Sequence, residues 1–316
     1  MKSLLKIIIV CHKNDYFLSK ICVASIRYYY PSVKIFLVKD FLNGQFSTRE
    51  MEKYFNVKIL DLGINKFGWC SAKIHLLISR QLGDDQYLVL DSDVVFIGYV
   101  LDKLTKQVNS TDFIVSPENL TDLNSKQFKA HYYNFSWVKS RFPSFRYPGY
   151  PFNGGQIVIQ TGVIHPSDVS PFFQPDIFPY WTSIANEHLP LRDQSLLNIL
   201  LPELQRQKRL RLVPIKFMWW SESIEVRQLL DINEIKNAKY PYIIHWAGSP
   251  RSRFLRNITR SDILYFFQHL YYNQVPFGNI RFVFANMINM LRFYLNKFGR
   301  QLIQEILILL FKGKYG

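Results

Sequence analysis

Two carboxylates close an apolar run in the first third of the chain, where Tyr87 to Leu90 is followed by Asp91-Ser92-Asp93. Residues at i and i+2 of an extended chain project to the same side, so both carboxylates can face one ligand. Hard oxygen ligands suit Mg²⁺ or Mn²⁺, and such a cation also binds phosphate oxygens. A bare Asp-x-Asp can be a solvated turn, but the apolar run favours a metal site that stabilises a diphosphate leaving group.

A second apolar run, Tyr242 to Ile244, also ends in a polar ligand, His245, and Gly248 and Arg251 follow it. A glycine turn and a basic side chain can approach and neutralise phosphate groups. A histidine by itself is more often a hydrogen-bonded structural residue. Beside an Asp-x-Asp motif, we predict His245 as a third metal ligand.

Two further segments are candidates for contacts with a substrate. Phe152 to Gly155 is predicted to be a polar turn before a buried strand, either a plain turn or a place where glycine lets a sugar approach the backbone. Asp193 and Gln194 stand at the predicted start of a helix. Asp193 is therefore either a helix cap or part of a reaction centre.

The elements that must position these residues alternate along the first half of the chain. The apolar patterns predict strands over 5–10, 33–38, 57–60 and 86–90, and helices over 16–29, 47–54 and 71–81. This order predicts a parallel, doubly wound sheet, in which ligands bind beyond the carboxyl ends of the strands. Later elements are a long surface excursion over 120–151, a strand over 156–160, a helix over 193–201 and a strand over 242–245.

The order and approximate spacing of these four motifs resemble glycosyltransferase family 8, over roughly residues 5 to 255. The resemblance implies a GT-A fold, an α/β, Rossmann-like architecture whose mostly parallel central sheet is flanked by helices. It implies metal binding by Asp91, Asp93 and His245, and a reaction that retains the anomeric configuration. It further implies the following roles: diphosphate contact by Arg251, and sugar and reaction-centre contacts by Asn153, Asp193 and Gln194.

The same resemblance places the nucleotide near the loop from Cys11 to Asp15 and near Lys73. The donor-binding residues that follow from it are Cys11, Asn14, Asp15, Lys73, Ser92, Gly154, Gly248 and Arg251. The chain departs from the family at two positions, because Arg251 stands where the family has lysine and Ser195 where it has a third acidic residue. The tract 120–150 has no counterpart that we can place.

Composition limits the class of protein. Hydrophobic residues make up 48% of 316, which is ample for a large core. Cys11, Cys22 and Cys70 form no CxxC pair, so we expect neither a disulfide framework nor structural zinc, and a reducing compartment is the simpler interpretation. No apolar run reaches about 18 residues and the first is too short for a signal peptide, so no transmembrane helix is expected.

The net charge of +15 is concentrated at the C-terminus, where residues 251–316 carry ten Lys or Arg against two acidic residues. From 280 to 311 the pattern predicts an amphipathic helix with basic residues among aromatic and aliphatic ones. Such a helix is typical of an anionic membrane interface. The alternative is a helix packed on its own domain or in a homodimer.

The sequence therefore predicts a GT-A catalytic domain, residues 1–255, followed by a basic amphipathic helical extension, residues 256–316. The predicted activity is transfer of a hexose from UDP-Gal or UDP-Glc to a glycan or glycolipid, with Mn²⁺ or Mg²⁺. The predicted location is cytoplasmic, peripheral on the inner face of a membrane. A nucleotidyltransferase is less favoured because the loop from Cys11 to Asn14 has no glycine, and aliphatic residues among the basic ones favour lipid over nucleic acid. A non-catalytic relative that binds sugar nucleotides is a further alternative.

Overall fold

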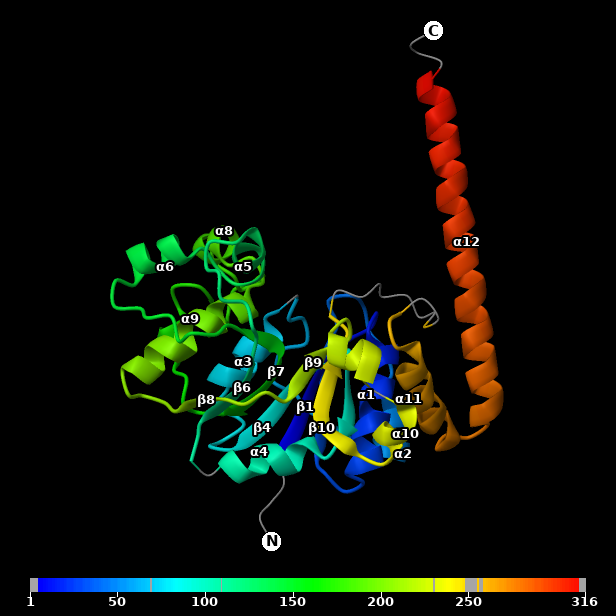
Figure 1. Ribbon diagram of the computed structural model, residues 1–316, viewed down its shortest axis with the longest axis horizontal. Coiled ribbons are helices and arrows are strands. Elements are labelled where there is room, and N and C mark those ends of the chain that lie inside the picture. The colour runs from blue at the N-terminus through cyan, green and yellow to red at the C-terminus, as the bar shows by residue number, and fades with distance from the viewer. Residues whose placement is uncertain are drawn as a thin grey trace. The chain divides into compact units, whose positions relative to one another are not determined.

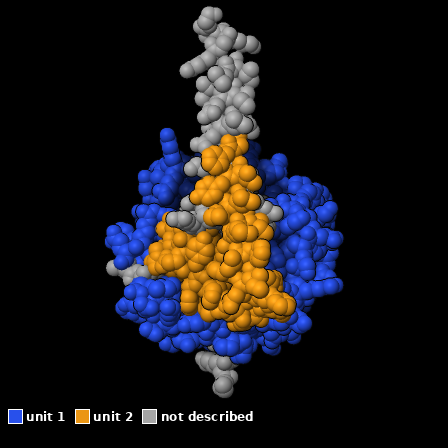
Figure 2. All heavy atoms as spheres, turned by 90° about the vertical axis from the view of Figure 1, so that its right-hand side faces the viewer, with its two compact units in different colours: residues 1–247 blue, residues 248–316 orange. Residues whose placement is uncertain are grey.

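The computed structural model describes residues 5–68, 70–108, 110–229, 231–247, 255 and 258–312. The chain divides into two compact units, residues 1–247 and residues 248–316 (Figure 2). Each unit is described by itself below.

A seven-stranded sheet forms the centre of the first unit, with the order β3-β2-β1-β4-β7-β6-β8 (Figure 1). Strands β3, β2, β1 and β4 run parallel, β7 is antiparallel to both of its neighbours, and β6 and β8 are parallel. The mostly parallel sheet predicted from the sequence is therefore confirmed. The strands are β1 (Lys6–His12), β2 (Ile35–Asp40), β3 (Val57–Ile59), β4 (Gln86–Asp91), β6 (Phe113–Pro117), β7 (Phe152–Gln160) and β8 (Leu212–Pro214).

A second, three-stranded sheet has the order β5-β10-β9. Its strands are β5 (Val94–Gly98), β9 (Met218–Trp220) and β10 (Lys239–His245). Strand β10 runs antiparallel to β5 and parallel to β9. Only two residues separate β4 from β5, so the chain passes directly from the large sheet to the small one at the Asp-x-Asp motif.

Helices surround the sheets of the first unit (Figure 1). Apolar runs such as Ile7 to Ile9 are fully buried, as expected for strands covered on both faces. The helices are α1 (Tyr16–Tyr29), α2 (Arg49–Phe55), α3 (Ala72–Ile78), α4 (Val100–Val108), α5 (Lys126–His131), α6 (Phe135–Arg141), α7 (Pro166–Val169), α8 (Ser183–His188), α9 (Asp193–Arg206) and α10 (Ile232–Lys236), with a π-helical turn η1 (Glu225–Leu229).

The tract 120–151 is not the irregular surface excursion that the sequence predicts. It contains α5 and α6, and each is capped by a side chain, since Ser125 accepts from the Phe128 amide and Asn134 from the Ser136 amide. Four aromatic residues of the tract are buried in the core, and the others pack against it partly buried. The four buried residues are Phe128, Tyr132, Tyr133 and Phe145. The prediction was wrong because helices of six and seven residues are too short to produce a recognisable period.

The second unit contains α11 (Ser261–Asn273) and α12 (Gly278–Lys312). The helix predicted over 280–311 is confirmed. Helix α12 meets α11 through Phe282, whose ring lies 5.5 Å from that of His269 and 5.9 Å from that of Tyr272. No helix among the described residues has the length and apolarity needed to cross a bilayer.

Candidate active site

The three predicted metal ligands lie together. Asp91 ends β4, Asp93 lies in the turn to β5, and His245 ends β10. The pairing of His245 with Val94 across β10 and β5 brings the imidazole to Asp93, with 3.1 Å between Nε2 and Oδ1. One ligand atom from each of Asp91, Asp93 and His245 lies within 4.8 Å of the others. Two carboxylates and an imidazole in this arrangement fit Mn²⁺ or Mg²⁺ with coordination positions left for phosphate oxygens.

The carboxylates are partly buried, whereas the imidazole is almost fully buried. The side chains of Asp91 and Asp93 are 36% and 25% exposed, against 2% for His245. Trp220 stacks on His245 with 5.1 Å between ring centroids and 17° between planes, which fixes the imidazole plane. Burial favours the neutral forms of Asp93 and His245, but the attraction between their charged forms outweighs this effect. The pKa of Asp93 is therefore lowered and the pKa of His245 is raised.

Lys73 connects the metal ligands to Asp193. Its Nζ lies 2.6 Å from Asp91 Oδ1 and 3.4 Å from Asp193 Oδ2. The two carboxylates are therefore no further apart than the sum of these distances, although 102 positions separate them in sequence. Burial disfavours the ammonium form, but Asp91 and Asp193 outweigh it and raise the pKa of Lys73. The pKa of Asp91 is raised by burial and by Asp93, against the opposite effect of Lys73.

The segments around Asn153 and Asp193 also converge. Gln194 Oε1 accepts hydrogen bonds from Asn153 Nδ2 and from the Gly154 amide, both at 2.9 Å. The Gln194 amide group also donates to the His131 carbonyl at 2.9 Å. Gln194 thus ties β7 and α5 to the start of α9.

The turn predicted over Phe152 to Gly155 is part of β7, so that prediction was wrong. Glycine is unfavourable inside a strand unless another group approaches the backbone closely. A Cβ on Gly155 would lie 2.4 Å from His245 Cε1, 2.7 Å from Asn153 Oδ1 and 2.8 Å from Asp91 Oδ2. Gly155 therefore lets β7 lie directly against the metal ligands.

Asp193 has a local contact as well as the one to Lys73. Its Oδ1 accepts from the Gln194 amide at 2.7 Å, so the carboxylate supports the first turn of α9. The cap position itself is Arg192, which has a φ of 39° and forms no side-chain cap. The two interpretations of Asp193, as helix support and as part of a reaction centre, are therefore compatible.

The predicted nucleotide-binding loop, Cys11 to Asp15, begins inside β1, which extends to His12, and then leaves the carboxyl end of the sheet. The Cys11 thiol is buried against Ser19 Oγ at 3.2 Å, and burial raises its pKa to about 12. Asn14 is exposed, and Asp15 pairs with His12 at 2.6 Å. Ser92 is buried in the turn between the metal ligands. The predicted donor contacts Gly248 and Arg251 lie outside the described residues.

The sequence-based interpretation overlooked Glu118. Burial raises the pKa of this carboxyl group, and Tyr132, Trp220 and His245 lie close enough to act against that rise. Glu118 directly follows the buried strand β6, as Asp91 ends β4. That position was the signal that could have identified it.

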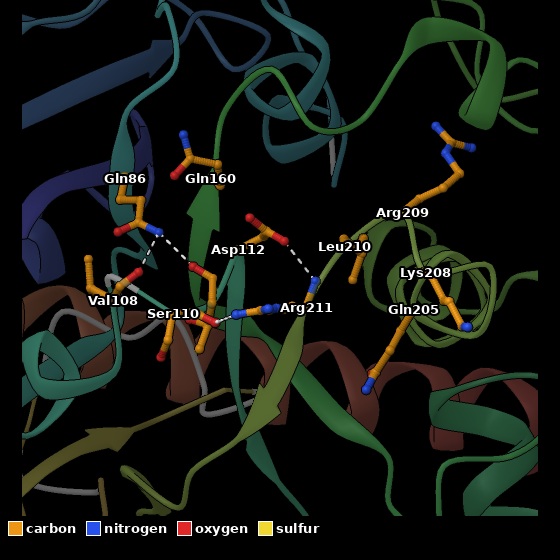
Figure 3. A pocket seen from close by; sticks show the side chains of 11 residues that line it. Gln86, Val108, Ser110, Asp112, Gln160, Gln205, Lys208, Arg209, Leu210 and Arg211 are labelled. Carbon is orange, nitrogen blue, oxygen red and sulfur yellow. Dashed lines mark hydrogen bonds between the residues drawn. The ribbon is translucent and has the colours of Figure 1, made fainter.

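A polar cavity of about 780 Å³ lies at the end of β4 opposite the candidate metal site (Figure 3). Gln86 lines it at the start of β4, whereas Asp91 ends that strand about 17 Å away at the usual rise per residue. The cavity is therefore separate from the candidate metal site. Its other labelled lining residues include Asp112, Gln160, Lys208 and Arg211.

Comparison with known proteins identifies the fold. Neither a family model nor a curated protein matches the chain in sequence. Among solved structures it is similar to the bifunctional glycosyltransferase WbbM, with 13% identity and a TM-score of 0.56 over 91% of this chain. It is also similar to the galactosyltransferase LgtC bound to donor and acceptor sugar analogues (14%, 0.53, 86% of this chain) and to GlyE of Streptococcus pneumoniae TIGR4 (12%, 0.51, 89%).

The chain has the GT-A glycosyltransferase fold. The match covers 98% of LgtC, but the chain spans only about half of WbbM, 52%, and 62% of GlyE. The fold class predicted from the sequence is confirmed by these neighbours.

Proposed function

We propose that the chain is a metal-dependent glycosyltransferase that transfers a hexose from a nucleotide sugar to a hydroxyl group of a glycan or glycolipid. The observation that carries this proposal is the linked set Asp91, Asp93, His245, Lys73 and Asp193 at one edge of a glycosyltransferase fold. Ligands of open α/β sheets bind at this edge.

Asp91, Asp93 and His245 would hold the cation, which when bound neutralises the charge that develops on the departing diphosphate. Lys73 supplies a fixed positive charge beside them, and a preorganised charge of this kind stabilises a transition state without reorganisation. Gln194 holds Asn153 by the 2.9 Å hydrogen bond, so both polar side chains are positioned before a sugar arrives. The proposed reaction retains the anomeric configuration, and we assign no general base to the protein.

The structural neighbours support a hexose donor. LgtC is described as a galactosyltransferase that binds donor and acceptor sugar analogues. UDP-Gal and UDP-Glc are therefore the donors that we propose, with Mn²⁺ or Mg²⁺.

A thermal-shift screen of nucleotide sugars tests this function. We expect UDP-hexoses to raise the unfolding temperature only when Mn²⁺ or Mg²⁺ is present, because a ligand that binds the native state stabilises it by about 2.7 kcal/mol at 100 times its Kd. A shift with nucleoside triphosphates and none with UDP-hexoses would favour a nucleotidyltransferase instead.

We further propose that α12 binds an anionic membrane surface, where a glycolipid acceptor would be found. Its apolar residues are exposed over half or more of their surface at several positions, including Ile280, Val283, Phe284, Leu291, Leu295 and Phe298. At 3.6 residues per turn these positions fall on one side of the helix. The chain supplies Arg281, Arg292, Lys297 and Arg300 along the same helix, and each basic residue near an anionic surface adds about 1 kcal/mol.

Leu291→Asp is expected to weaken binding of the full chain to phosphatidylglycerol-containing vesicles by about tenfold or more, since it places a charge in the apolar side of the helix. Flotation of the protein with vesicles measures this. Asn289→Asp is the matched control, because it makes the same charge change on the other side of α12. Equal flotation of the two variants, with loss of a dimer in Leu291→Asp alone, would show a helix–helix interface instead.

A further inference from the structure

An apolar patch lies at the same edge of the sheet as the candidate metal site. It consists of Leu42, Ile177 and Phe178, which are 44%, 62% and 53% exposed. Leu42 follows β2, and Gly68, over which Leu42 and Phe178 meet, follows β3. Both strands run parallel to β4, which ends at Asp91. The patch therefore belongs to the edge where a donor and an acceptor would meet.

The patch is assembled by the close approach of two loops at Gly68. A Cβ built on Gly68 would lie 3.6 Å from Leu42 Cδ2 and 3.7 Å from Phe178 Cε2, so both apolar side chains converge over this glycine. Its φ of +70° is one that residues with side chains rarely adopt. Leu42 and Phe178, although far apart in sequence, thus form one surface.

The loop that carries Ile177 and Phe178 is held in place by its backbone. The Gln174 amide donates to the Tyr180 carbonyl at 2.7 Å, and the Tyr180 amide donates to the Ile177 carbonyl at 2.7 Å. The Tyr180 hydroxyl donates to the Lys66 carbonyl at 2.8 Å, which fastens the loop to the segment that follows β3. The Phe178 ring packs edge-on against Tyr180, with 5.4 Å between centroids, and still remains half exposed, while Ile177 is more exposed. The fixed loop therefore presents Ile177 and one side of Phe178 to solvent.

Lysines lie on or beside the segments that form the patch. Lys13 reaches the loop that contains Leu42, with its Nζ 3.4 Å from the position of a Cβ on Gly44. Lys39 lies over the Phe41 ring at 5.1 Å, and Lys66 is exposed on the segment that holds Tyr180. Among the described residues of these segments, the exposed carboxylates are Asp61, which follows β3, and Asp176 beside the tip. An exposed apolar tip with lysines on the segments that carry the patch suits an anionic bilayer, in which apolar side chains enter the interface and lysines contact phosphate groups.

We propose that this patch docks on an anionic membrane, with Ile177 and Phe178 entering the interface and the lysines contacting lipid phosphates. Docking in this manner turns the edge that holds Asp91 and Asp93 towards the headgroup layer, where a lipid-linked hydroxyl can reach it. The choice of a lipid-linked acceptor rests on the proposed transferase function. The patch lies within residues 1–247 and is a second contact, independent of α12.

The test measures vesicle binding of the full chain carrying Ile177→Ser, without donor or acceptor. Binding to vesicles of phosphatidylcholine and phosphatidylglycerol is expected to weaken about fivefold, because a half-exposed aliphatic side chain no longer enters the interface. Ile177→Leu, which keeps the apolar character, should bind as the unchanged chain does. Tyr99→Ser removes an exposed apolar side chain after β5, at the opposite edge, and should also leave binding unchanged. The same comparison in a Leu291→Asp background removes the contribution of α12.

Equal binding by Ile177→Ser and Ile177→Leu in both backgrounds would overturn the proposal. So would unchanged vesicle binding with slower transfer to a lipid-linked acceptor, since the patch would then hold the alkyl chain of the acceptor. Metal-dependent binding of UDP-hexose is measured separately for Ile177→Ser and for the unchanged chain. If neither protein binds UDP-hexose, the transferase proposal fails while the vesicle result still stands.

Discussion

Asp93→Asn should abolish Mn²⁺-dependent binding of UDP, weakening it by more than about a hundredfold, because even outer-shell changes at metal sites cost tenfold to a hundredfold. The amide keeps the shape of the side chain but removes the negative charge that both the cation and His245 require. Isothermal titration of UDP with and without Mn²⁺ measures the loss. The two ligand atoms concerned, Asp93 Oδ1 and His245 Nε2, lie 3.1 Å apart.

The matched control is Asp112→Asn, which neutralises a carboxylate of the cavity at the opposite edge of the sheet. It should leave Mn²⁺-dependent UDP binding as it is in the unchanged chain. Circular dichroism and thermal unfolding show whether each variant is folded. Metal-dependent UDP binding that survives in a folded Asp93→Asn variant would contradict the proposed metal site.

Asp193→Asn should lower the rate of sugar transfer by roughly 100- to 1,000-fold, the effect of removing one group that stabilises a transition state electrostatically. UDP binding should fall much less, because Asp193 is not among the metal ligands. The change also leaves Lys73 with Asp91 as its only carboxylate partner among the described residues. Single-turnover rates and donor affinity, measured on the same preparation, separate the two effects.

Ser195 provides a control for the helix-support role of Asp193. Its Oγ accepts from the Leu191 amide at 3.2 Å, so Ser195→Ala weakens the start of α9 without touching Lys73. If Asp193 only supports the helix, Asp193→Asn and Ser195→Ala should lower the unfolding temperature and the transfer rate in parallel. A large loss of rate confined to Asp193→Asn would support the reaction-centre role.

Strands β6 and β8 of the large sheet were not predicted from the sequence. Strands β1, β2 and β4 were predictable because they are continuous apolar runs, and a strand buried on both faces produces that pattern whatever surrounds it. The Asp-x-Asp motif was predictable for the same reason, since it ends such a run. The position of Gly155 within a strand was not predictable, because glycine and asparagine are typical of turns and only the proximity of His245 and Asp91 explains them here. The residues adjacent to Gly155 in the sequence do not indicate that contact.

The pairing of Lys73 with both Asp91 and Asp193 could be identified only from the folded structure. A lysine near the start of a helix is ordinarily a solvated residue, and its two partners lie 18 and 120 positions further along the chain. The helices α5 and α6 were missed because each is shorter than the window in which a helical period becomes visible. Glu118 was missed because it stands in no motif, although it follows a buried strand as Asp91 does.

The position of His245 affects which part of the first unit unfolds first. Asp93 and His245 are separated by 152 positions, and His245 belongs to the small sheet whereas Asp91 ends a strand of the large one. A cation held by all three residues would join the two sheets and fasten the last strand of the unit to its middle. Its binding energy would then be added to the cost of local opening there, in proportion to the logarithm of the metal concentration above its Kd. Depletion of the metal would therefore loosen the region around β10 before the parallel strands at the centre of the large sheet.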